Sequence, residues 1–295
     1  MKIWSALPTP LTNDLVIDEP SLERMIEASI ADQVTGIFLA GTCGEGPWLP
    51  NPERTRLVKA AVKAAKGRLR IAVQVSDNSV PRILQNIAEA ADAGADVAII
   101  APPATMMNVT PPRIVALYEG AAAKSPLPIG IYDLGSRRQF SIPIDRLESV
   151  YLLPNVELVK DSSAEPARRQ VALGARRKKP GLQLFNGDEF RCIDYLEAGY
   201  DGCMFGGGVV VAPMVRRIVE RFRAGDLEGA QRIDREMVAI LHGVYGGPSI
   251  ACWLSGLKYY MHRRKLFSTY ASFLEYPLYP ECRAFIDAHV EKSSA

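Results

Sequence analysis

VELVKDS at residues 156–162 is typical of a buried strand in a parallel sheet, and it is one of seven such runs in the chain. The other six are GIFLAG (36–41), RIAVQV (70–75), DVAIIAP (96–102), PIGIYD (128–133), LQLFNG (182–187) and DGCMF (201–205), with a weaker eighth, WSALPTP (4–10). Near-continuous apolar character indicates strands that are covered on both faces by helices. Amphipathic segments such as NPERTRLVKAAVKAA (51–65) lie between the runs. The pattern therefore predicts repeated strand–helix units.

The number and spacing of these units decide between two α/β architectures. Successive runs are separated by roughly 25–35 residues, the length of one strand–helix unit. Eight such units close into a (β/α)8 barrel, also called a TIM barrel, of about 250 residues. The competing doubly wound sheet normally carries a GxGxxG motif after an early strand, and this sequence has none. We therefore predict an α/β fold of the (β/α)8 barrel type.

The C-terminal part of the chain differs from the rest, because no strand-like run occurs after about residue 227. Three helical patterns follow: DLEGAQRIDREMVAILHGVYGG (226–247), SIACWLSGLKYYMHRRK (249–265) and YPECRAFIDAHVEK (279–292). We predict a barrel over residues 1–226 and a C-terminal helical extension, packed on the barrel, over residues 227–295.

Composition excludes several classes of function. The 295 residues include 35 Lys+Arg and 33 Asp+Glu, and 48% are hydrophobic, which is typical of a globular protein and not of a supercharged nucleic-acid binder. Five cysteines without CxxC spacing and three scattered histidines argue against a disulfide framework or a metal site. The sequence shows neither a signal peptide nor an apolar run of about 18 residues, so we expect a cytoplasmic protein that does not bind membranes.

Polar residues follow several of the predicted strands. In a barrel the active site lies at the carboxyl ends of the strands, so these residues are the candidates. They are Thr42-Cys43-Gly44-Glu45, Tyr132-Asp133, Lys160-Asp161 and Gly187-Asp188-Glu189.

Lys160 gives the strongest chemical signal, because it ends a strand that should be buried. Burial disfavours an ammonium ion, and a neutral amine can form a Schiff base with a carbonyl group. Position alone leaves a second interpretation open, in which the lysine reaches the barrel rim or pairs with Asp161. Tyr132 ends the preceding strand and could carry protons to and from Lys160. Its alternative role is that of a packed aromatic residue.

GTCGEG at residues 41–46 forms a glycine-rich turn before the next helix. Successive backbone N–H groups in such a turn can bind an anion such as a carboxylate. The turn lacks the GK[ST] ending of a nucleotide-binding P-loop. A plain tight turn is the alternative interpretation.

At these residues the chain resembles the dihydrodipicolinate synthase/N-acetylneuraminate lyase family of class I aldolases. ALPTP (6–10), GTCGE (41–45), Tyr132, Lys160 and NGDE (186–189) match the family's motifs in order. The resemblance implies a 2-oxo acid such as pyruvate, bound as an imine to Lys160. It further implies that Tyr132 moves protons, and that the backbone amides of Thr42 and Cys43 hold the carboxylate. Finally, it implies a homotetramer or dimer that needs no metal or organic cofactor.

The chain also departs from the family's synthases. Cys43 stands where they have a second Thr of a proton relay, and the stretch PPATMM (102–107) lacks the Tyr that completes that relay. Asp133 replaces an Asn and Ala164 a Gly. Arg137 falls where synthases hold the carboxylate of the aldehyde substrate.

These departures shape the predicted activity. We expect a class I aldolase or lyase that is not a true dihydrodipicolinate synthase, with Asp188 and Glu189 holding hydroxyl groups of the substrate. One alternative is a Schiff-base dehydratase or deaminase of a 2-keto-3-deoxy sugar acid or cyclic imino acid. Another is a barrel that only binds a metabolite.

Overall fold

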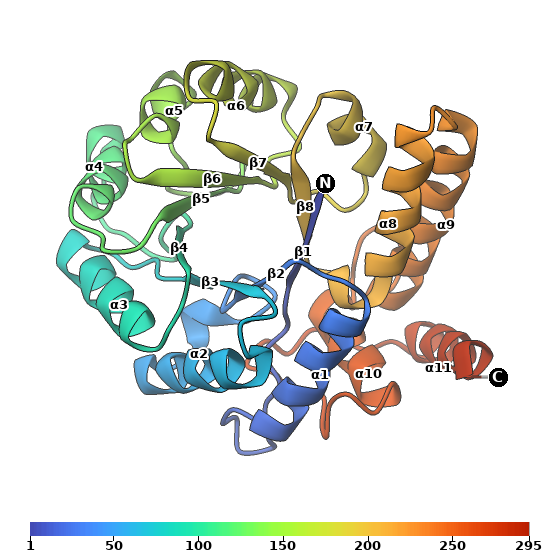
Figure 1. Cartoon of the computed structure of the whole chain (residues 1–295). Helices are drawn as coiled ribbons and strands as arrows, with labels where there is room; N and C mark the ends of the chain where they lie inside the picture. Colours follow the sequence, from blue (N-terminus) through green and yellow to red (C-terminus); the bar gives the residue numbers. More distant parts are fainter. Residues whose placement is uncertain (295) are drawn as a thin grey trace. The chain divides into compact units, whose positions relative to one another are not determined.

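The protein folds as a (β/α)8 barrel with further helices at the C-terminal end of the chain (Figure 1), as the sequence predicts. The computed structural model describes residues 1–294, with side chains as far as Lys292. The hydrogen-bonded order of the parallel strands is β1 to β8, closed on itself. The strands are β1 (Lys2–Ala6), β2 (Gly36–Leu39), β3 (Arg70–Gln74), β4 (Val97–Ile100), β5 (Ile129–Asp133), β6 (Val156–Asp161), β7 (Gln183–Asn186) and β8 (Gly202–Phe205).

Helices alternate with these strands. They are α1 (Glu19–Ala31), α2 (Asn51–Ala65), α3 (Val80–Asp92), α4 (Pro111–Ala122), α5 (Ile144–Tyr151), α6 (Pro166–Lys178), α7 (Cys192–Glu197) and α8 (Gly208–Arg223), with a short 3-10 helix η1 (Gly46–Trp48). The chain continues into α9 (Leu227–Tyr245), α10 (Trp253–Arg263) and α11 (Pro280–Ser294). No helix among residues 1–294 is long and apolar enough to cross a membrane.

Two compact units make up the chain, and the candidate residues are divided between them. One unit contains residues 1–2 and 70–205, and the other contains residues 3–69 and 206–295. The catalytic candidates Tyr132 and Lys160 belong to the first unit, whereas the turn at 41–46 belongs to the second.

Strand burial in the first unit follows from the apolar runs. Every residue of β4 and β5 is buried, and α3 to α6 lie outside the strands β3 to β6 (Figure 1). Gly130 lies in β5 where the neighbouring strands leave no room for a side chain. A Cβ atom there would be 2.8 Å from side-chain carbons of both Ile99 and Leu158. This close packing holds β5 in register with its neighbours, and the carboxyl ends of β5 and β6 carry Tyr132 and Lys160.

Helix–helix packing dominates the second unit. Helices α8 and α9 pack side by side, and α9, α10 and α11 pack against one another. Asp18 caps α1 by accepting a hydrogen bond of 3.2 Å from the backbone N–H of Ser21, and Asp226 caps α9 by accepting one of 2.9 Å from that of Gly229. The long C-terminal helices thus form part of a compact unit with α1, α2 and the turn at 41–46.

Candidate active site

Tyr132 and Lys160 lie side by side at the carboxyl ends of β5 and β6. The two residues are register partners in the parallel strand pair. The Nζ atom of Lys160 is 4.2 Å from the centroid of the Tyr132 ring. Lys160 is 4% exposed and Tyr132 is 6% exposed. The structure thus brings the two predicted catalytic residues together in a place shielded from solvent.

Lys160 and its neighbour Asp161 point to opposite faces of the strand, because successive strand side chains alternate. Asp161 accepts hydrogen bonds from the hydroxyl groups of Ser163 and Tyr200, both at 2.7 Å. Burial raises the pKa of the Asp161 carboxyl, and the nearby charge of Asp133 acts in the same direction. The hydrogen bonds from Ser163 and Tyr200 oppose that rise. This geometry argues against the interpretation in which Lys160 sits on the barrel rim or pairs with Asp161.

Gly187 lies beside the side chain of Lys160 and leaves no room there for a side chain of its own. A Cβ atom at this position would lie 3.0 Å from Cε of Lys160 and 2.0 Å from Oγ of Ser162. The backbone N–H of Gly187 donates a 2.7 Å hydrogen bond to the carbonyl oxygen of Asp161. Any side chain at residue 187 would therefore displace Lys160 or the loop that follows it.

Asp188 and Glu189 continue the turn from Gly187. The carboxylate of Asp188 accepts a 3.2 Å hydrogen bond from the backbone N–H of Phe190. Burial raises the pKa of Asp188, while the charge of Arg191 partly offsets the effect. Glu189 is 8% exposed. The turn thus places two acidic side chains, one partly and one fully buried, immediately after the glycine that touches Lys160.

Arg168 is a residue of this region that sequence reasoning missed. It comes from α6 and forms a buried ion pair with Asp133, in which each side chain is 2% exposed. Its Nε donates to Oδ2 of Asp133 at 2.8 Å and its Nη2 to Oδ1 at 2.8 Å. The hydroxyl of Tyr151 donates to Oδ2 at 2.9 Å. The residue after Tyr132 is therefore held from two helices.

The loop after β5 carries Arg137, which is exposed. The backbone N–H and the hydroxyl of Ser136 donate to Glu165 at 2.6 and 2.7 Å, and Arg168 donates to the carbonyl oxygen of Ile142 at 3.0 Å. Partial burial acts to raise the pKa of Glu165. The hydrogen bonds from Ser136 nevertheless hold that pKa below its usual value, and the charge of Arg137 acts in the same direction. A fixed loop thus presents an exposed guanidinium group.

Two backbone hydrogen bonds close the turn at 41–46, which belongs to the second unit. The N–H of Gly46 donates to the carbonyl oxygen of Gly41 at 3.1 Å, and the N–H of Glu45 donates to that of Thr42 at 3.2 Å. The thiol of Cys43 is 4% exposed and donates to the carbonyl oxygen of Ala6 at 3.0 Å. Thr42 is half-buried.

Lys258 in α10 was also missed, because a lysine in an amphipathic helix is expected at the surface. It forms an ion pair with Glu45, and both side chains are 0% exposed. Burial lowers the pKa of Lys258, whereas the charge of Glu45 acts to raise it. The glutamate of the turn is therefore bound to a helix far along the sequence.

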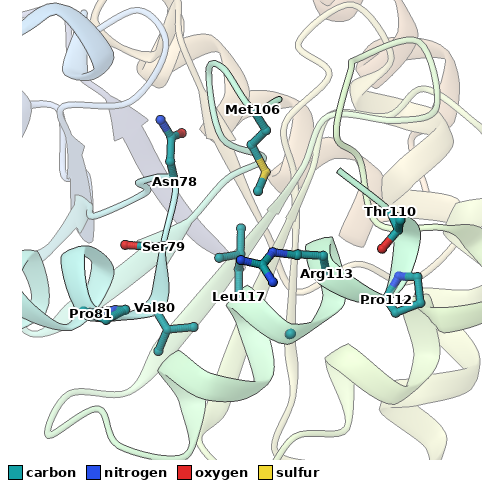
Figure 2. A pocket seen from close by; sticks show the side chains of 10 residues that line it. Asn78, Ser79, Val80, Pro81, Met106, Thr110, Pro112, Arg113 and Leu117 are labelled. Atoms are coloured by element: carbon teal, nitrogen blue, oxygen red, sulfur yellow. The ribbon is translucent and has the colours of Figure 1, made fainter. Parts of the chain in front are cut away.

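The stretch that lacks the family's tyrosine borders a separate cavity in the first unit. Figure 2 shows this cavity of about 550 Å³, to which Met106, Asn78 and Arg113 contribute. The starts of α3 and α4 supply most of its lining, and Tyr132 and Lys160 are not among the lining residues. Met107 is 90% exposed. Within residues 1–294, no group of three or more His, Cys, Asp or Glu side chains could hold a metal ion.

Comparisons with known proteins agree on one family. The model of the dihydrodipicolinate synthetase family matches residues 1–279. The chain is 26% identical over 254 residues to a 4-hydroxy-tetrahydrodipicolinate synthase of Rhodopseudomonas palustris (strain BisA53), covering 86% of this chain and 84% of the relative.

Two solved structures are similar in fold. Dihydrodipicolinate synthase from Bacteroides thetaiotaomicron has a TM-score of 0.86 at 26% identity, covering 99% of this chain and 98% of that one. A prophage protein of E. coli K12, solved in complex with pyruvate, has a TM-score of 0.87 at 18% identity, covering 99% and 98% of the two chains.

Proposed function

This chain belongs to the dihydrodipicolinate synthetase family, whose members share a class I aldolase-like fold, and we propose that it is a lyase acting on pyruvate or a related 2-oxo acid. The reaction proceeds through a Schiff base on Lys160. The observation that carries this proposal is the buried pair in which Nζ of Lys160 lies 4.2 Å from the ring centroid of Tyr132. Support for the choice of acid comes from the pyruvate complex of the E. coli K12 relative.

Lys160 begins the proposed reaction. Its amine nitrogen adds to the C2 carbonyl of the 2-oxo acid, and loss of water leaves an imine. Tyr132 gives its phenol proton to the hydroxyl that leaves as water, so the imine is left protonated and the tyrosine becomes a phenolate. In the cleavage direction, this phenolate takes the proton of the C4 hydroxyl as the C3–C4 bond breaks. The electron pair of that bond moves into the imine, which becomes an enamine, and an aldehyde leaves. Proton return to C3 and hydrolysis of the imine release pyruvate and restore Lys160.

Three further sets of residues bind the carboxylate, the hydroxyl groups and a second anionic group of the substrate. We assign the carboxylate of the 2-oxo acid to the backbone amides of Thr42 and Cys43, by the family resemblance and the shape of the turn. The acidic side chains of Asp188 and Glu189 suit hydroxyl groups of the substrate, because carboxylates accept hydrogen bonds strongly. The exposed guanidinium of Arg137 suits a second anionic group.

Borohydride trapping tests the Schiff base. Pyruvate with borohydride should add one reduced pyruvyl group, and peptide mass spectrometry should locate it on Lys160. Lys160→Ala should abolish trapping, and Lys178→Ala, which removes a surface lysine, should not. Label on a surface lysine, or none at all, would refute the Schiff-base reading and leave a barrel that only binds a metabolite.

Product analysis separates the lyase from its alternatives. A lyase releases free pyruvate from a hydroxylated 2-oxo acid, whereas a dehydratase or deaminase releases water or ammonia and keeps the carbon chain intact. Synthase activity with pyruvate and aspartate semialdehyde should be about 10²–10⁴-fold below that of an ordinary enzyme. The reason is that Cys43, a weak donor, takes the place of a relay hydroxyl, and the stretch at 102–107 contains no Tyr. Turnover of several per second in that assay would show that the relay argument is wrong.

A further inference from the structure

Glu45 and Lys258 form a fully buried ion pair within the second unit. Both side chains are 0% exposed. Lys258 also donates a 2.7 Å hydrogen bond to the carbonyl oxygen of Ala271. Taking two charges out of water is costly, and apolar side chains in their place are often as stable or more so. Stability alone therefore gives no reason for this pair.

The second carboxylate oxygen of Glu45 reaches the segment that follows α10. It accepts hydrogen bonds from the hydroxyl of Ser272 at 2.8 Å and from the backbone N–H of Phe273 at 2.6 Å, with a longer one of 3.3 Å from the N–H of Leu274. One carboxylate of the glycine-rich turn is thus bound to α10 and to three consecutive residues beyond it.

The backbone of Glu45 shows what these contacts impose on the turn. Its φ angle is +55°, in the left-handed region that residues other than glycine adopt only at a cost in conformational energy. Glu45 is also the residue before η1, and its own N–H closes the turn onto Thr42. The ion pair therefore holds a strained residue in the turn that carries the amides of Thr42 and Cys43.

We propose that Glu45 and Lys258 are positioning residues, which fix the turn at 41–46 so that its amides can bind the carboxylate of the 2-oxo acid. The helical segment after residue 226 then takes part in substrate binding through α10. The identity of the ligand rests on the function proposed above, whereas the mechanical role of the ion pair does not.

The double variant Glu45→Gln/Lys258→Met tests this role. Glutamine keeps an oxygen for the N–H of Phe273, and methionine fills the volume of the lysine without a charge, so no unpaired charge is buried. Glu27→Gln is the matched control, because it removes a carboxylate from an exposed ion pair with Arg68 in the same unit. Ser272→Ala is a milder second variant that removes one hydrogen bond to Glu45 and buries no charge.

Two measurements are compared across these variants. Amide hydrogen exchange of a peptide spanning residues 41–46 should be faster in the double variant, to a smaller degree in Ser272→Ala, and unchanged in Glu27→Gln. The KM for the 2-oxo acid should rise about 10- to 100-fold in the double variant, the worth of one hydrogen bond to a charged group, with a much smaller change in kcat.

The outcomes separate the two proposals. If wild-type protein forms no imine with pyruvate, the proposed function fails, and the exchange measurement still decides the role of the ion pair. Unchanged exchange at residues 41–46 in folded double variant and in Ser272→Ala would overturn the positioning role. So would a wild-type KM in a double variant that retains imine formation.

Discussion

Asp133 places a negative charge directly after Tyr132, in a position where 2% of its side chain is exposed. Arg168 and Tyr151 satisfy this carboxylate from two different helices. Because Asp133 and Asp161 are also register partners on β5 and β6, the carboxylates that follow Tyr132 and Lys160 are bound on the side of the strands away from the catalytic pair. The two catalytic candidates thus stand on strand ends that buried polar groups hold in place.

Tyr132→Phe tests the proton-carrying role of the phenol. The variant keeps the ring beside Lys160 and loses only the hydroxyl. Turnover should fall about 10²–10⁴-fold, the usual contribution of positioned acid–base catalysis, while borohydride trapping of pyruvate becomes slower and remains detectable. Steady-state kinetics and mass spectrometry check the two parts. A wild-type kcat would show that Tyr132 serves only in packing.

Arg168→Met tests the buried ion pair. Removal of the guanidinium leaves the Asp133 carboxylate buried without its cation, and the free energy of unfolding should fall by about 3–5 kcal/mol. Urea denaturation measures this change. Arg146→Met is the control, because Arg146 pairs with Asp145 at the surface, where loss of a pair changes stability by less than about 1 kcal/mol. Similar losses in the two variants would contradict the importance of burial.

Asp133→Asn/Arg168→Met removes both charges and should recover part of that stability, because no unpaired ion remains. A double variant less stable than Arg168→Met would mean that the hydrogen bond from Tyr151 to the carboxylate outweighs the ion pair.

At the scale of elements, the apolar runs predicted the strands well, because a strand that is buried on both faces consists of consecutive apolar residues. The run DGCMF (201–205) contains β8, and even the weak run from residue 4 marks β1, which begins earlier, at Lys2. Helix ends depend on single polar side chains and are harder to predict. Asp18 is an example, since its carboxylate accepts hydrogen bonds from both the N–H and the hydroxyl of Ser21.

Asp18→Ala should lower the free energy of unfolding by about 1–2 kcal/mol, because α1 loses its N-terminal cap. Partial burial acts to raise the pKa of Asp18, but hydrogen bonds from Ser21 and Ser268 outweigh it and lower that pKa below the usual value of about 3.9. A carboxyl group whose pKa is lowered by folding stabilises the fold at pH values above its pKa in the unfolded chain. That contribution is lost as the pH falls through the lower, folded pKa.

The difference in stability between wild type and Asp18→Asn should therefore be constant from about pH 7 to pH 5 and shrink below about pH 4. Denaturation at several pH values measures it. A difference that grows as the pH falls would contradict the lowered pKa.

At the scale of the whole molecule, the barrel fold predicts which residues lie at the strand ends. It does not predict the distant charged residues that hold those strand ends and the turn at 41–46 in place. Lys160 and Tyr132 were predicted because each ends an apolar run. Arg168 and Lys258 lie in amphipathic helices, where a charged residue is ordinarily solvated, and Lys258 meets Glu45 across 213 residues of sequence. No local sequence pattern predicts the Glu45–Lys258 pair, because it depends on how segments far apart in the sequence pack together in the fold. The division at residue 226 stays a prediction.

A chain that ends at residue 226 tests that division. Loss of α9 uncovers the face of α8 on which it packs, and loss of the chain after residue 226 removes Lys258 and the hydrogen bonds of residues 272–274 to Glu45. Each buried apolar side chain that becomes exposed costs about 1.5–3 kcal/mol, so a few of them amount to a large part of the 5–15 kcal/mol that stabilises an ordinary domain. We therefore expect residues 1–226 to show no cooperative thermal unfolding by circular dichroism. Residues 1–292 are the control and should melt as the full chain does. A cooperative transition in the shorter chain would mean that the barrel folds independently of the C-terminal helices, and that Glu45 finds another partner or water once Lys258 is gone.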